Sequence, residues 1–163
     1  MSSKLLCLTC LFLLGVAASE SAKADTVTDH GSTYALTYSA TSNPRAFDIF
    51  LTVNTTGFTG DHSDLLNAVA LQLVPDYSDI TSVSLLSGPS HFGSTIKGDS
   101  VGNNGCSSAH GDGFFCSESS NDGLPVASIG DIYNFEWLLT VGSTRDLMTG
   151  FHDATVQALY VDD

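Results

Sequence analysis

The sequence has few positive charges, with 5 Lys and Arg against 18 Asp and Glu in 163 residues and a formal net charge of −13. An acidic surface of this kind repels phosphate backbones and anionic lipid headgroups. We therefore expect no nucleic-acid binding and no binding to a membrane surface. Divalent cations and neutral sugars are compatible partners, although solubility alone also explains the charge.

The sequence also lacks an apolar run long enough to cross a membrane. Its N-terminal apolar stretch, from Leu5 to Ala18, spans only about 21 Å as a helix, short of a roughly 30 Å hydrocarbon core. One cation, Lys4, precedes this stretch, and the small-x-small sequence Ala22-Lys23-Ala24 follows it. This order of features is the pattern of a secretory signal peptide.

We therefore predict a signal-peptide helix over residues 1–24, with cleavage between Ala24 and Asp25. A second small-residue site upstream, Val16-Ala17-Ala18, leaves the cleavage position open. Residues 25–163 suit one domain with a single core. We expect this domain to be periplasmic, on the cell surface or extracellular, with no stable membrane insertion after cleavage. The sequence leaves its oligomeric state undetermined.

Cysteine is scarce, because Cys7 and Cys10 lie in the predicted signal peptide and leave only Cys106 and Cys116. An even pair in an exported chain most often forms a disulfide, which we predict here. A zinc site is disfavoured because the two cysteines have no second pair. The Gly- and Ser-rich residues 102–120 are expected to form a surface loop that this bond pins.

Helical stripes of apolar residues are absent as well, and several segments instead alternate apolar and polar residues with a period of two. This alternation is typical of half-buried strands. The clearest examples are residues 46–54, with Phe47 and Ile49 on one face, and residues 132–142, with Leu139 and Val141 on one face. We also predict strands over residues 33–41, 67–74, 81–87, 94–97, 114–117, 126–129 and 155–161.

Turns rich in Gly, Ser, Asn and Asp separate these segments. About eight or nine short strands at spacings near ten residues favour two packed antiparallel sheets over βαβ units. The predicted fold is therefore an all-β, two-sheet antiparallel sandwich of the jelly-roll type. Its strand order cannot be deduced from the sequence.

Acidic residues in the turn-rich segments are the candidate metal ligands. Asp beside Gly is the usual composition of a tight turn, and that interpretation is favoured. The alternative is a calcium site, because oxygen ligands on exposed loops of an acidic exported domain suit a hard cation. The candidate ligands are Asp61, Asp64, Asp112 and Asp122. We expect no other cofactor.

The sequence Asp61-His62-Ser63-Asp64 contains each residue type of a hydrolytic triad. Neighbours in sequence seldom supply the geometry of nucleophile, base and orienting acid, so we interpret this segment as a solvated turn. A hydrolase that uses His62 and His110 is the remote alternative. We predict that the protein is not an enzyme.

Three aromatic residues, Tyr133, Phe135 and Trp137, share one face of a predicted strand. They could form a platform for a sugar ring. The same face also carries Leu139 and Val141, which favours the interpretation that all three pack in the core.

Several segments resemble exported bacterial proteins of the PEP-CTERM sorting-domain type. The resemblance rests on residues 34–38, 47–53, 66–71, 104–106, 113–116 and 158–162. Proteins of this type are associated with exopolysaccharide and biofilm formation in Gram-negative bacteria, and the resemblance implies no catalytic residues. The family's Pro-Glu-Pro motif, apolar span and basic tail are missing before Asp163. We expect either a truncated sequence or a member that is released rather than anchored.

The leading hypothesis is a non-enzymatic secreted or cell-surface protein, an extracellular-matrix component associated with exopolysaccharide in a Gram-negative bacterium. The alternative is a carbohydrate-binding or calcium-stabilised adhesion module. An exposed aromatic row or a cluster of carboxylates would favour the alternative.

Overall fold

A computed structural model describes residues 25–60, 65–73, 80–93, 95–103, 105–107, 114–119, 130–142 and 154–161. The predicted signal peptide, with Ala24 at its end, lies outside the described residues. Asp25, on the other side of the predicted cleavage position, is the first residue of the first strand.

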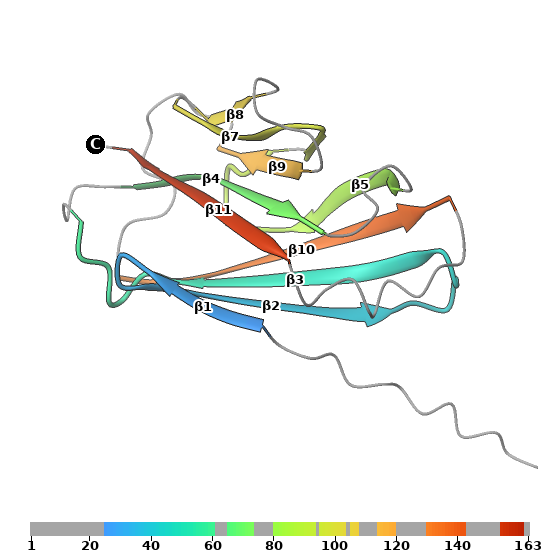
Figure 1. The fold of residues 1–163 in the computed structure, drawn as a ribbon, viewed down its shortest axis with the longest axis horizontal. Coiled ribbons are helices and arrows are strands. Elements are labelled where there is room, and N and C mark those ends of the chain that lie inside the picture. Colours follow the sequence, from blue (N-terminus) through green and yellow to red (C-terminus); the bar gives the residue numbers. More distant parts are fainter. Residues whose placement is uncertain are drawn as a thin grey trace, which may run out of the picture.

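The described residues form two antiparallel sheets and a separate hairpin (Figure 1). The five-stranded sheet contains, in spatial order, β1 (Asp25–Asp29), β2 (Ser32–Ala40), β3 (Ala46–Asn54), β10 (Ile132–Val141) and β5 (Ile80–Ser87). The four-stranded sheet contains β11 (Thr155–Val161), β4 (Leu65–Gln72), β9 (Phe114–Glu118) and β6 (Ile96–Lys97). The hairpin consists of β7 (Ser100–Gly102) and β8 (Gly105–Ser107).

The chain winds as a jelly roll. The strand pairs β4 with β11, β5 with β10 and β6 with β9 are nested within one another in sequence, and they alternate between the two sheets. A long antiparallel hairpin folded over on itself produces this nesting. The hairpin of β2 and β3 and the N-terminal β1 complete the larger sheet. The predicted all-β, two-sheet antiparallel sandwich is therefore confirmed.

Alternation in the sequence decides which side chains face the core. Along β2, buried and half-buried residues alternate from Ser32 to Ser39, and β10 repeats the pattern from Phe135 to Val141. The buried faces of both sheets meet in one cluster, as expected for a sandwich. Its largest fully buried side chains include Ile49, Leu51, Leu66, Leu71, Phe115, Phe135, Trp137 and Leu139.

The strand β4 is buried on both faces, unlike β2. Its inward residues join the main core, whereas Ala68 and Ala70 point the other way and pack with Phe114 and Cys116 in a second cluster. Val101 of β7 and Cys106 of β8 cover this cluster. Figure 1 shows β7 and β8 on the far side of β4 and β9 from the five-stranded sheet. The hairpin therefore forms a partial third layer.

The predicted disulfide is present. Cys106 of β8 and Cys116 of β9 are bonded, with their Cα atoms 5.7 Å apart. The expectation that the bond pins a surface loop is wrong for residues 105–107, because β8 pairs with β7 and packs over β4. The bond therefore fastens a packed hairpin to the sheet beneath it.

Sequence alternation located the long strands closely. The bounds of Ala46–Asn54 and Thr155–Val161 are those predicted, and β10 ends one residue before the prediction. The strands β1, β7 and β8 were not predicted. The predicted strand over residues 126–129 lies outside the described residues.

Candidate functional site

An open cleft of about 870 Å³ lies between two edge strands. The strand β1 is at the edge of the five-stranded sheet, and β11 is at the edge of the four-stranded sheet. Consecutive residues of each strand line the cleft, from Val27 to Asp29 on β1 and from Val156 to Tyr160 on β11. This cleft is the candidate binding site.

A tight turn between β1 and β2 shapes one end of the cleft. His30 and Gly31 both have positive φ, 46° and 79°, as in the type I′ turns that suit two-residue hairpins. A Cβ atom on Gly31 would lie 1.8 Å from the carbonyl oxygen of Gly57, so only glycine fits against the neighbouring loop. The backbone N–H and the hydroxyl of Thr59 both donate to the carbonyl of His30, at 2.9 and 3.1 Å. The turn and the loop of residues 55–60 therefore hold each other.

A buried hydroxyl anchors the other end of this loop. Thr55 has no exposed surface, and its Oγ1 donates to the carbonyl of Asp131 at 2.9 Å. The same oxygen accepts from the backbone N–H groups of Gly130 and Asp131, at 3.0 and 3.2 Å. One hydroxyl thus satisfies three backbone groups, which fixes the loop on the segment that leads into β10.

The anchored loop carries an aromatic ring into the cleft. Phe58 packs on Tyr160 of β11 with ring centroids 4.5 Å apart and an interplanar angle of 32°. Both side chains are half-buried, so part of their surface faces solvent. The pair links the loop to the edge of the four-stranded sheet and gives the cleft an apolar wall.

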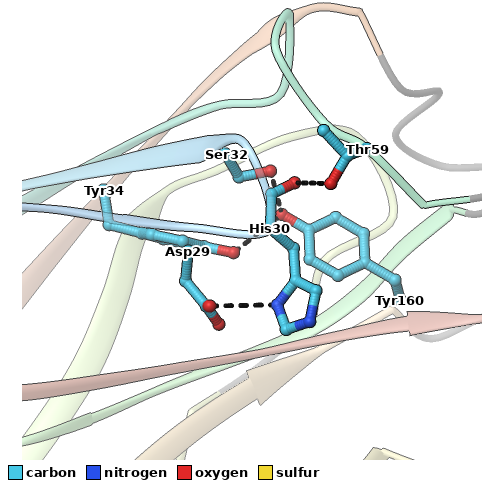
Figure 2. A network of polar contacts seen from close by, with 6 residues as sticks. All are labelled: Asp29, His30, Ser32, Tyr34, Thr59 and Tyr160. Carbon is cyan, nitrogen blue, oxygen red and sulfur yellow. Dashed lines mark hydrogen bonds and ion pairs between the residues drawn. The ribbon is translucent and has the colours of Figure 1, made fainter.

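Three hydroxyls form a chain behind this wall (Figure 2). Tyr160 donates to Ser32 Oγ at 2.9 Å, and the hydroxyl oxygens of Tyr34 and Tyr160 are also 2.9 Å apart. A phenol has a single proton, so Tyr34 must donate to Tyr160. Burial, reinforced by the Tyr160 contact, raises the pKa of Tyr34 well above its usual value near 10. Tyr34 therefore stays neutral and holds Tyr160 in position.

Replacing Tyr34 with phenylalanine should flatten the pH dependence of stability above about pH 10. Above about pH 10 the folded protein keeps the Tyr34 hydroxyl proton, whereas the unfolded chain releases it. The contribution of Tyr34 to the free energy of unfolding is therefore complete below about pH 10 and is lost as the pH rises toward the raised pKa. Urea unfolding at about pH 8 and about pH 11 measures the effect. The unaltered protein should lose more stability between these two conditions than Tyr34→Phe, and equal losses would contradict the assignment.

The mouth of the cleft carries polar groups. Asp29 Oδ1 and His30 Nδ1 are 3.0 Å apart, with both side chains more than two-thirds exposed, at 71 and 76% (Figure 2). On the opposite wall, Gln157 Oε1 accepts from the backbone N–H of Val101 at 3.2 Å. A carboxylate, an imidazole and an amide therefore surround an aromatic wall. This arrangement suits a ligand with apolar faces and hydroxyl edges.

The less favoured alternative, a sugar platform of Tyr133, Phe135 and Trp137, is wrong for Phe135 and Trp137. Phe135 is 1% exposed and Trp137 is 0% exposed, and both belong to the main core together with the half-buried Tyr133. The two rings stack on each other with centroids 5.5 Å apart and an interplanar angle of 6°. They face the opposite sheet, because Trp137 Nε1 donates to Ser117 Oγ on β9 at 3.0 Å. The alternation of their strand marks core packing, the favoured interpretation of this segment.

The candidate calcium ligands Asp61, Asp64, Asp112 and Asp122 all lie outside the described residues, as do His62 and His110 of the remote hydrolase hypothesis. Within the described ranges, no group of three or more His, Cys, Asp or Glu side chains is placed to hold a metal ion.

Comparisons with known proteins give no relative. No family model matches the chain, and neither a curated protein nor a solved structure matches it. In the part of the chain that the structure describes, no helix has the length and apolarity needed to cross a membrane.

Sequence reasoning missed the cleft because its residues are far apart along the chain. Tyr34, Phe58 and Tyr160 come from a strand, a loop and the last described strand. The available signals were local: His30-Gly31 is a hairpin-turn sequence, and Tyr34 and Tyr160 lie in predicted strands. Only the packing of the two sheets against each other brings these three residues together.

Proposed function

We propose that this is a non-enzymatic exported protein that binds neutral polysaccharide in the cleft between β1 and β11. In the fuller form of the proposal, it is a periplasmic, cell-surface or extracellular component of the exopolysaccharide matrix of a Gram-negative bacterium. The resemblance to PEP-CTERM proteins and the signal-peptide pattern of residues 1–24 support this setting.

The aromatic wall of the cleft is the observation that carries the proposal. Sugar rings present apolar C–H faces, which pack on aromatic rings, and hydroxyl edges, which exchange hydrogen bonds with carboxylates, amides and imidazoles. The pair of Phe58 and Tyr160 supplies the rings, while Asp29, His30 and Gln157 supply polar groups at the margin. A volume of about 870 Å³ is within the range of ligand sites.

Charge selects a neutral polymer over an anionic one. With a formal net charge of −13, the protein repels polysaccharides that carry carboxylates or sulfates. Asp29 at the mouth of the cleft adds to this repulsion locally. Neutral hydroxyls, in contrast, can donate to its carboxylate.

The disulfide between Cys106 and Cys116 supports an extracytoplasmic setting, because such bonds persist in oxidising compartments.

We propose binding rather than hydrolysis because of the number of carboxylates that line the cleft. Asp29 is the one carboxylate among the described residues that line it. Glycoside hydrolysis by the usual mechanism uses two carboxylates that flank the scissile bond.

Replacing Phe58 with alanine should weaken polysaccharide binding about tenfold, because the aromatic wall is lost. Isothermal titration calorimetry against dextran, mannan, xylan and mixed-linkage β-glucan, with and without calcium, measures this change. Alginate, which is anionic, should not bind.

The matched control for this experiment is Phe50→Ala. Phe50 is 36% exposed and lies on the solvent-facing side of β3, away from the cleft. This variant should bind as the unaltered protein does. The proposal would be overturned if the protein bound none of the neutral polysaccharides, or if Phe58→Ala and Phe50→Ala lost equal affinity.

A further inference from the structure

A second hollow of about 610 Å³ lies against the hairpin of β7 and β8. Its described lining includes Gly102, Asn103 and Ser107 of the hairpin together with Leu159 of β11. Glycine backbone and the polar side chains of Asn103 and Ser107 make up most of the lining, and Asn103 is exposed to solvent. The hollow therefore offers hydrogen-bonding groups beside a small apolar contact.

The second hollow shares part of its lining with the cleft. Val101 and Leu159 line both of them. The hydrogen bond from the backbone N–H of Val101 to Gln157 Oε1 holds β7 beside β11 at this junction. The two hollows therefore meet at Val101 and Leu159, on neighbouring strands of the same region of the surface.

The hairpin that forms the second hollow is held in place from below. Its disulfide joins Cys106 to Cys116 of β9, and the backbone N–H of Cys106 donates to Glu118 Oε2 at 2.6 Å. Gly105 has a φ of 125°, and a Cβ atom there would lie 2.2 Å from Glu118 Oε2. Glycine at this position lets the carboxylate reach the backbone. The hairpin beside the second hollow is therefore held in one position, as a preorganised binding surface requires.

We infer that the hairpin provides a second subsite for the same polymer, so that the protein binds an internal stretch of an extended neutral polysaccharide. This inference rests on the proposed function and specifies its ligand as a chain that continues past the aromatic wall. Short oligosaccharides fill the cleft alone, whereas longer ones also contact Asn103 and its neighbours. Affinity should therefore rise with chain length.

The test compares disaccharides and octasaccharides of the cello-, malto- and manno- series by calorimetry on the full exported domain. The unaltered protein should bind the octasaccharide of the preferred series about tenfold more tightly than the disaccharide. Asn103→Ala should weaken octasaccharide binding about fivefold and affect the disaccharide much less. The matched control is Asn134→Ala, an exposed asparagine on the solvent-facing side of β10.

Two results would overturn the second subsite. One is equal affinity for the disaccharide and the octasaccharide. If Phe58→Ala still weakens disaccharide binding in that case, the cleft proposal stands and only the second subsite is lost. The other is a length dependence that Asn103→Ala and Asn134→Ala change equally. Absence of binding at both lengths in all three series would overturn the cleft proposal and the second subsite together.

Discussion

Replacing Trp137 with alanine should lower the free energy of unfolding by about 3–5 kcal/mol, the largest single effect expected in this domain. Trp137 is fully buried, stacks on Phe135 and meets Phe115 of the opposite sheet edge-on, with centroids 5.7 Å apart. Its indole N–H also donates to Ser117 Oγ across the sandwich. Alanine would leave a cavity at the point where the two sheets meet.

Guanidinium unfolding followed by far-ultraviolet circular dichroism measures this loss. Fluorescence is unsuitable because the chain has 1 tryptophan, which the variant removes. Trp137→Phe serves as the graded control, since it keeps a ring but leaves Ser117 without this donor, and it should cost less. A loss below about 1 kcal/mol for Trp137→Ala would contradict the central place of this residue in the core.

The second large effect is expected from the disulfide. The double variant Cys106→Ala/Cys116→Ala should be less stable by about 3 kcal/mol, because the bond closes a short loop and restricts the unfolded chain. The cysteines are 10 residues apart in sequence. Their bond also holds the hairpin over Ala68, Ala70 and Phe114, so its removal should loosen that layer before the main core.

Guanidinium unfolding gives the total loss for the double variant, and amide hydrogen exchange locates it. Exchange should accelerate in β7 and β8 while β3 and β10 stay protected. The unaltered protein treated with a reductant is the control and should behave as the double variant does. Uniform acceleration across both sheets would contradict the local role of the bond.

The sandwich could be predicted because its long strands carry their burial pattern in their own sequence. Residues 46–54 alternate apart from the exposed Phe50, and the structure buries Ile49, Leu51 and Val53 on one face of β3. The strand β4 departs from alternation because it is covered on both sides. Its nearly continuous apolar run is the pattern expected for such burial.

The missed strands are short and depend on their partners. The strands β7 and β8 lie in a segment rich in Gly and Ser, where local composition indicates turns. Their packing over β4 and their bond to β9 stabilise them from outside. Likewise β1 forms because the His30-Gly31 turn directs it onto β2. Tertiary contacts of this kind are not visible in a local sequence pattern.

The candidate cleft could not be located from the sequence. A sugar platform at Tyr133, Phe135 and Trp137 was the less favoured interpretation of that strand, and the structure places Phe135 and Trp137 in the core, as the favoured interpretation had it. The aromatic pair that borders solvent, Phe58 with Tyr160, joins a loop to an edge strand. Such a pair depends on the topology of the sheets.

Amide chemical-shift mapping by nuclear magnetic resonance tests the central claim most directly, because it locates the bound ligand on the surface. The probe is a neutral octasaccharide titrated into the isotope-labelled domain. The largest shifts should fall on His30, Phe58 and Tyr160, while the solvent-facing side of the five-stranded sheet around Phe50 stays unchanged. Shifts centred on Phe50, or no shifts with any neutral octasaccharide, would contradict polysaccharide binding in the cleft between β1 and β11.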